Sequence, residues 1–101
     1  KAIDSFWMMK YCLEERLRRG DAITPQVSER YVTSVYRNWI RTKMLPTYIK
    51  ECVFILTAAL FDNSIKADYP FRENRARMLI KAMKKRSYEA YVFVLNRWDV
   101  L

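Results

Sequence analysis

Histidine is absent from this chain of 101 residues, glycine occurs once and proline three times. Without histidine the Ser/His/Asp and Cys/His triads are excluded, and the commonest metal ligand is missing. A single glycine cannot form the glycine-rich loops that cradle phosphates. So few turn-forming residues also exclude a sandwich or barrel of short strands, which needs a turn about every ten residues. We therefore expect an all-α chain that is not an enzyme and has no cofactor and no metal site.

The two cysteines, Cys12 and Cys52, form no CxxC pair, and each lies in an apolar stretch of an expected helix. We expect both to be buried free thiols rather than a disulfide or a redox pair, which indicates a reducing compartment. The longest apolar run, from Cys52 to Phe61, has about half of the roughly twenty residues that a spanning helix needs, and no signal peptide is visible. We expect an intracellular, cytoplasmic protein without a membrane span.

Apolar content and positive charge dominate the composition. Hydrophobic residues make up 51% of the chain and aromatic residues 15%, and 19 Lys and Arg against 11 Asp and Glu give a net charge of +8. This content suits one folded domain over residues 1–101. The charge favours an anionic partner, which can be an acidic protein surface, nucleic acid or phospholipid headgroups. The chain begins with Lys1 rather than methionine, which indicates a fragment of a longer protein.

Apolar residues at spacings of three and four predict five helices. The first runs from Ile3 to Arg19, with Asp4 or Ser5 as its N-cap and Gly20 as its left-handed stop. The others are expected from Pro25 to the break at Pro46, from Thr47 to Phe61, from Arg72 to Arg86, and from Ser87 through Trp98, with Thr24 and Ser87 as N-caps. The expected architecture is a compact antiparallel bundle of five to six helices.

The apolar stripes also predict the core. The stretch from Val53 to Phe61 is apolar all round, so its helix is expected at the centre of the bundle or else in an interface. Trp7, Trp39 and Trp98 are expected in the core, and Tyr69–Pro70–Phe71 is expected to plug the bundle end, with an exposed anchor as the alternative. The last two helices are expected to bury Ala76, Leu79, Ile80, Met83, Tyr91, Val94, Leu95 and Trp98.

Positive charge is concentrated between Arg72 and Arg86, where seven cations accompany a single acid, Glu73. Arg77, Lys81 and Lys84 recur at helical spacing and are expected to form one stripe that projects into solvent. Such a stripe is either an ordinary solvated face or a surface for an anionic partner. The missing acids weaken the first interpretation, because like charges repel along a helix, and both interpretations stay open. The expected partner-binding residues are Arg72, Arg75, Arg77, Lys81, Lys84, Lys85, Arg37 and Arg41.

The C-terminal part of the chain resembles the last two helices of caspase recruitment domains. The matching stretches are Arg75–Ile80, Lys84–Ser87 and Ala90–Leu95, which form a basic leucine-rich helix, a basic turn and a helix with an alanine–aromatic pair. A looser resemblance covers residues 27–101. The chain departs from the family at Ser87, which stands where the family has a turn glycine, in the short segment 62–71, and in its extra first helix.

The resemblance implies a six-helix death fold that binds similar helical domains by apposing a basic surface to an acidic one. It implies an adaptor that recruits a protease, a kinase or an oligomeric scaffold in apoptosis or innate immune signalling. We therefore expect a non-enzymatic protein–protein interaction domain. The alternative is a nucleic-acid-binding module, such as one of viral origin, that uses the same stripe on phosphates. A third hypothesis is a structural subunit or homo-oligomer built on the apolar helix Val53–Phe61.

Overall fold

The described part of the chain is built only from helices. The computed structural model describes residues 2–101, with side chains from Asp4 onward, so Lys1 and the side chain of Ile3 lie outside the described residues. The elements are α1 (Ala2–Arg19), α2 (Pro25–Thr42), α3 (Thr47–Ser64), α4 (Asn74–Lys84), α5 (Tyr88–Asn96) and a 3-10 turn, η1 (Trp98–Val100). The predicted all-α class and helical bundle are confirmed for these residues.

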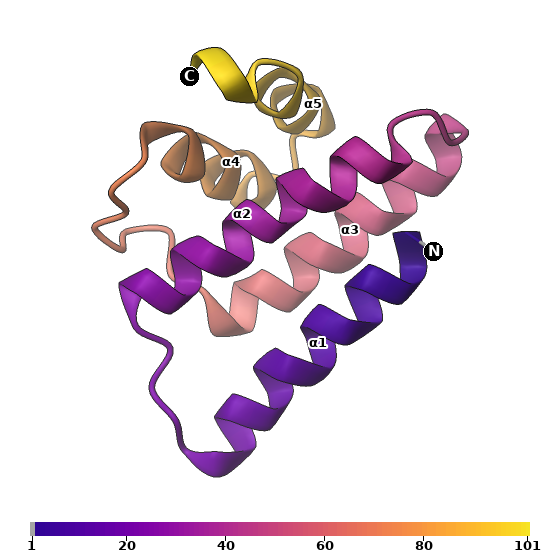
Figure 1. The fold of residues 1–101 in the computed structure, drawn as a ribbon. Helices are drawn as coiled ribbons and strands as arrows, with labels where there is room; N and C mark the ends of the chain where they lie inside the picture. Colours follow the sequence, from indigo (N-terminus) through magenta and orange to yellow (C-terminus); the bar gives the residue numbers. More distant parts are fainter. Residues whose placement is uncertain (1) are drawn as a thin grey trace.

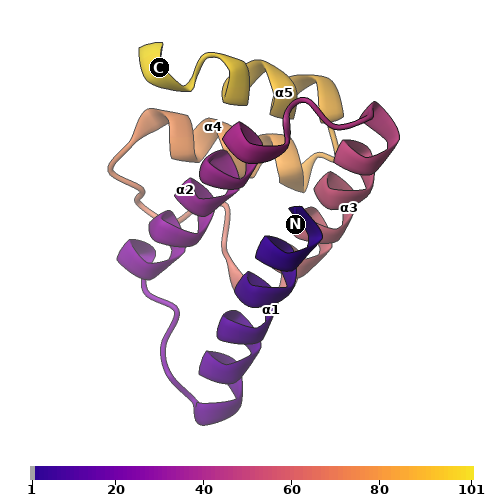
Figure 2. The ribbon, with the colours of Figure 1, turned by 45° about the vertical axis from the view of Figure 1, so that its right-hand side comes forward.

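Two helices, α2 and α3, occupy the middle of the bundle. α1 packs against both of them from one side, and α4 packs against both from the other side (Figure 1). α5 packs on α4, at the top of the view in Figure 1. Figure 2, turned by 45°, shows the same order, with α1 on one side of α2 and α3 and the α4–α5 pair on the other. α1 is therefore an outer helix that contacts only two neighbours closely.

Local signals at three helix ends are confirmed. The hydroxyl of Thr24 accepts a hydrogen bond from the backbone N–H three residues further on, at 3.2 Å, with Pro25 in the first turn of α2. The hydroxyl of Ser87 does the same at the start of α5, also at 3.2 Å. Gly20, which follows α1, has a φ of 76°, the left-handed conformation that glycine adopts without a steric penalty.

Two other helix boundaries differ from the prediction. α1 already begins at Ala2, so Asp4 and Ser5 lie inside the helix and neither is its N-cap. α3 continues past Phe61 to Ser64, whose hydroxyl donates to the carbonyl oxygen of Leu60 at 2.7 Å. A short polar side chain that bonds back to its own helix does not have to end that helix. Polar residues alone therefore did not mark these boundaries correctly.

α4 is shorter than predicted, Asn74–Lys84 rather than Arg72 to Arg86. Beyond its end Arg86 has a left-handed φ of 59°, and the N–H of Ser87 bonds to the carbonyl of Ala82 at 3.0 Å, which completes a Schellman motif. Arg86, and not Ser87, therefore occupies the left-handed position that a turn glycine would take. This conformation costs an L-residue about 1–2 kcal/mol. Ion pairing of the Arg86 guanidinium with Asp62 helps to hold it.

The predicted core of the last two helices is confirmed, since Ala76, Leu79, Ile80, Met83, Tyr91, Val94, Leu95 and Trp98 are all buried. Trp98 follows α5 and lies in η1. Phe71 is buried as well, and the hydroxyl of Tyr69 donates to the carbonyl of Ile23 at 2.9 Å. The aromatic connector therefore plugs the end of the bundle, as predicted, and ties it to the α1–α2 loop.

Several residues expected in the core are exposed instead. Trp7 is 53% exposed, although Trp39 and Trp98 are buried. Cys12 and Cys52 are free thiols as predicted, but both are exposed rather than buried. The helix that was expected at the centre leaves Ile55 56% exposed and Leu56 40% exposed. The physical reason is geometric: α1 and α4 pack on α3, and α5 contacts it at Phe54, but none of the described elements covers Ile55 and Leu56 fully.

Candidate basic interface

Arg75 is a structural residue of the described fold. Its guanidinium donates to the carbonyl oxygen of Trp98 at 2.7 Å and lies 4.8 Å from the centroid of the Trp98 ring. It also forms an ion pair with Glu73 at 3.2 Å. The Trp98 ring stacks on Tyr36 of α2, with centroids 4.9 Å apart and an interplanar angle of 10°. Arg75 therefore fastens the C-terminal turn to α4, and through Trp98 to α2.

Two other cations of α4 bond to the chain itself. Arg77 donates to the carbonyl of Phe71, and so holds the aromatic connector against the start of α4. Lys84 donates to the carbonyl of Phe61 at 2.8 Å and lies 3.7 Å from a carboxylate oxygen of Asp62. The predicted stripe of Arg77, Lys81 and Lys84 is therefore not free in solvent, because two of its three members join α4 to the connector and to α3.

Asp62 is the acidic centre of this joint. It pairs with Arg86 as well as with Lys84. The hydrogen bond from Arg86 holds the pKa of Asp62 below its ordinary value of 3.8; partial burial acts in the opposite direction, and the charges of Arg86 and Lys84 add to the lowering. Asp62 is thus ionised at neutral pH, and it links the end of α3 to the end of α4.

Three of the predicted binding residues of this region, Arg72, Lys81 and Lys85, are exposed. Within the described residues, none of their side chains has a hydrogen bond or an ion pair. Lys81 of α4 and Lys85, the C-cap residue just after it, are one helical turn apart and lie opposite the buried side of the helix. They form a small basic face that is available to a partner.

The outer face of α2 is the more extended basic surface. Arg30, Arg37 and Arg41 are all exposed, and their spacings of seven and four residues place them on one face of the helix. Among the described residues, no side chain pairs with any of them. The only acid of α2, Glu29, is turned toward α4, where its carboxylate accepts the backbone N–H of Glu73 at 2.8 Å. We call Arg30, Arg37 and Arg41 the α2 arginine face.

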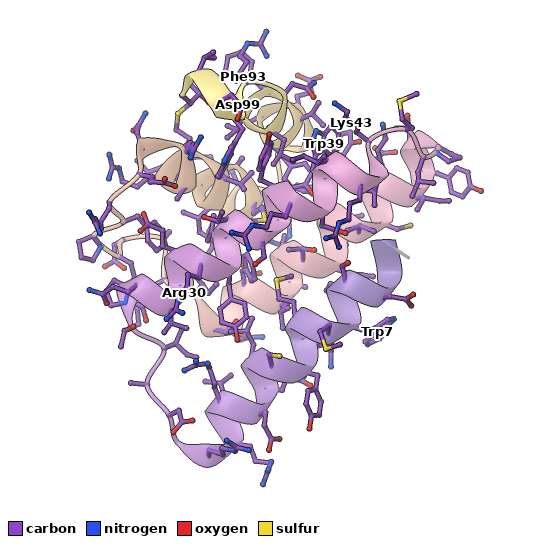
Figure 3. All side chains as sticks on the ribbon, in the orientation of Figure 1. Trp7, Arg30, Trp39, Lys43, Phe93 and Asp99 are labelled. Atoms are coloured by element: carbon purple, nitrogen blue, oxygen red, sulfur yellow. The ribbon has the colours of Figure 1, made fainter. Side chains whose placement is uncertain are left out.

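Figure 3 shows Arg30 near the start of α2 and Lys43 just beyond its end, so positive charge accompanies the whole helix. Arg37 and Arg41 were predicted from the sequence as binding residues, whereas Arg30 was missed. The signal that could have found it was present in the sequence: the spacing Arg30–Arg37–Arg41 repeats one helical face and carries no acid. The densest charge along the chain lies in and around α4, where Arg75, Arg77 and Lys84 bond to other parts of the fold.

Two hollows lie beside the α2 arginine face. Arg37 and Arg41 line a cavity of about 190 Å³ whose walls come from α1, α2, α3 and α5. Ser5, Ser34 and Thr57 line it as well. The second hollow, of about 440 Å³, runs between α1 and α2 and is lined mainly by Met8, Met9, Cys12 and Tyr31. Ser5, Met9 and Ser34 belong to both. The two hollows are therefore parts of one groove, which we call the α1–α2 groove.

Buried polar groups adjoin the basic part of this groove. Asn38 lines the cavity, and its Oδ1 is buried without a hydrogen-bond partner among the described residues. Tyr91 of α5 also lines the cavity, and burial, with a smaller contribution from Tyr88, raises the pKa of its hydroxyl far above the ordinary value of 10.0. Tyr91 is thus neutral at physiological pH. The charges of Arg37 and Arg41 allow this part of the groove to bind an anionic group.

Two other features are absent from the described residues. They contain no group of three or more His, Cys, Asp and Glu side chains that could hold a metal ion. None of their helices is both long enough and apolar enough to cross a membrane. A comparison of the chain with protein-family models, curated proteins and solved structures gives no match.

Proposed function

We propose that this chain is a non-enzymatic protein–protein interaction domain that binds an acidic surface of its partner through exposed basic helix faces. The observation that carries the proposal is the α2 arginine face, where Arg30, Arg37 and Arg41 point outward without any described ion pair. An exposed row of like charges repels itself, and an acidic partner relieves that repulsion. Lys81 of α4 and the C-cap residue Lys85 form a second, smaller face of the same kind.

The resemblance to caspase recruitment domains supports the same class of function. It makes another helical domain with an acidic surface the expected partner, and recruitment or assembly the expected role, as in apoptotic or innate immune signalling. The resemblance places the basic surface on the helix that contains Arg75 and Lys84, but both of these side chains bond to carbonyls of the chain itself. The α2 residues Arg37 and Arg41 therefore become the centre of the proposed surface.

Charge reversal tests the proposal. The double variant Arg37→Glu/Arg41→Glu and the double variant Lys81→Glu/Lys85→Glu change the charge equally and at the same helical spacing. The proteins captured by each variant from a nuclease-treated lysate are compared with those captured by the wild type, and the strongest partner is then purified for binary titration. We expect at least one double variant to lose roughly 100-fold in affinity for an acidic partner, at about tenfold per reversed charge. If both double variants bound the partner as tightly as the wild type does, the proposal would be refuted.

Two controls separate this result from general charge effects and from nucleic acid. The double variant Arg18→Glu/Arg19→Glu gives the same change in net charge at the C-terminal end of α1, and it should bind the partner as the wild type does. The wild type is also titrated with duplex DNA and with RNA over a range of salt. For a nucleic-acid-binding module, the logarithm of the association constant should fall by roughly one unit per log of salt for each phosphate contacted. Tight binding of this kind, together with loss of the protein partners after nuclease treatment, would establish that module instead.

A further inference from the structure

We propose that the α1–α2 groove is the docking site for an acidic amphipathic helical segment of the partner protein. The segment would place carboxylates against Arg37 and Arg41 and aliphatic side chains against the methionines of α1. This inference rests on the proposed function, because it requires a partner that is acidic. The inference specifies the place on this chain where the partner docks and the kind of segment that the partner presents.

The floor of the groove is apolar and open. Met8 is 67% exposed and Cys12 is exposed, whereas Met9 and Tyr31 are half-buried. Methionine side chains are flexible and polarisable, so they adapt to the shape of an apolar ligand. The acid at the edge of this hollow, Asp4, already has an interaction partner. An aliphatic ligand face would therefore remove from water apolar side chains that the fold leaves uncovered.

The charge of the groove defines the other side of its ligand. Arg37 and Arg41 line the smaller of the two hollows, and none of the described acids pairs with them. A carboxylate placed between them would meet two guanidinium groups, the donors that match carboxylate geometry best. Asn38 lies at the same end, but its unpartnered atom is Oδ1, which accepts hydrogen bonds, so the two arginines and not Asn38 are the donors for a carboxylate. Charge complementarity therefore selects an acidic ligand over a basic or neutral one.

The length of the surface fits a helix of about three turns. From Arg30 to Arg41 is a span of eleven residues, or about 16 Å along the helix axis. A ligand helix with acids on one edge and aliphatic residues at spacings of three and four would match both the arginine face and the groove floor. A second copy of this chain suits the site poorly, since each copy carries a net charge of +8 and the carboxylate of Glu15 on α1 is already paired.

A display library of random helix-length peptides is the probe that tests this docking site. Peptides are selected on the wild type and then measured on Met8→Glu and on Arg37→Glu/Arg41→Glu. Met44→Glu is the matched control, because Met44 is 91% exposed and lies outside the groove. We expect selected peptides that combine acids with aliphatic residues at helical spacing. Their affinity should fall roughly tenfold for Met8→Glu and about 100-fold for the double arginine variant, with no change for Met44→Glu.

The two cysteines supply a second readout with an internal control. Cys12 lines the groove and Cys52 does not, and both are exposed free thiols. Selected peptides should slow the alkylation of Cys12 at least fivefold, in proportion to occupancy, and leave the alkylation of Cys52 unchanged.

The possible outcomes separate this inference from the proposed function. One outcome is that acidic peptides depend on Arg37 and Arg41 but bind Met8→Glu normally and leave Cys12 reactive. This would refute docking in the α1–α2 groove and would still support binding through the basic surface. The same holds for peptides that depend only on Lys81 and Lys85. Selected peptides without acids, or no enrichment at all, would overturn the groove as an acidic docking site; the purified-partner titration then decides the proposed function independently.

Discussion

Replacing Arg75 by alanine should destabilise the fold by about 2–3 kcal/mol, although Arg75 is one of the residues that the sequence predicts as a binding cation. Its largest contribution is the charge-assisted hydrogen bond to the carbonyl of Trp98 at 2.7 Å. Such bonds contribute about 1.5–3 kcal/mol, and a partly exposed cation–π contact adds about 0.5–1 kcal/mol. The ion pair with Glu73 is exposed enough to add little.

These contributions share one side chain and are not strictly additive, so the expected loss lies in the middle of their combined range. For a domain of this length, unfolding entropy is roughly 0.2 kcal/mol per kelvin, and the variant should melt about 10–15 °C below the wild type. Because the stability of a small domain is about 5–15 kcal/mol, Arg75→Ala should still fold.

Urea unfolding followed by far-ultraviolet circular dichroism measures this loss directly. Lys81→Ala is the matched control, since Lys81 lies on the same helix, is exposed and makes no described contact; its stability should stay within about 0.5 kcal/mol of the wild type. If Arg75→Ala were as stable as Lys81→Ala, the fastening of the C-terminal turn by Arg75 would be refuted. A confirmed loss would mean that charge reversal at Arg75 reports on folding rather than on partner binding.

Two further predictions concern buried and ionised groups. Ser28 is fully buried and its hydroxyl has no partner among the described residues, so Ser28→Ala should raise the stability by about 1 kcal/mol and the melting temperature by about 5 °C. Ser64→Ala, which loses a bonded hydroxyl, should show no gain; an unchanged Ser28→Ala would mean that its hydroxyl is satisfied. Asp62→Asn should lose about 0.5–1 kcal/mol at neutral pH, because the ion pairs of Asp62 with Arg86 and Lys84 are lost. The pKa of Asp62 is lower in the folded than in the unfolded state, so this difference should be full above about pH 5 and disappear as the pH falls through 3.8 and the lower folded value. A difference that persists at about pH 2 would contradict an electrostatic origin.

Local sequence signals predicted most of the secondary structure because they act between residues that are close in the chain. Thr24 and Ser87 cap their helices, and Gly20 takes the left-handed position, since each needs only neighbours three to six residues away. The left-handed position after α4 could not be predicted in the same way. An arginine is disfavoured there, and the ion pair that helps to hold Arg86 comes from Asp62, which lies 24 residues earlier.

The candidate site was only partly predictable for a related reason. Charge density along the chain correctly indicated a basic protein, but whether a given cation is free depends on which carbonyl or carboxylate reaches it. Arg77 and Lys84 bond to carbonyls of Phe71 and Phe61, and no helical periodicity encodes the second of these contacts. The α2 arginine face was visible as a spacing, but its freedom from ion pairs became apparent only when Glu29 was found turned toward α4.

The sequence by itself determined the class of structure: a helical bundle of strong positive charge with a dependable core in its last two helices, because apolar periodicity and composition are properties of the chain alone. Only the tertiary structure decided which apolar and charged side chains remain uncovered. Trp7 and Cys12 were predicted to be buried, and Met8 is an apolar residue of the same helix. All three are exposed, because α1 packs on two helices and the rest of its surface stays open. The apolar pattern of a helix predicts which of its faces favours burial. How many neighbouring elements cover the helix is decided by tertiary packing, which the pattern does not encode.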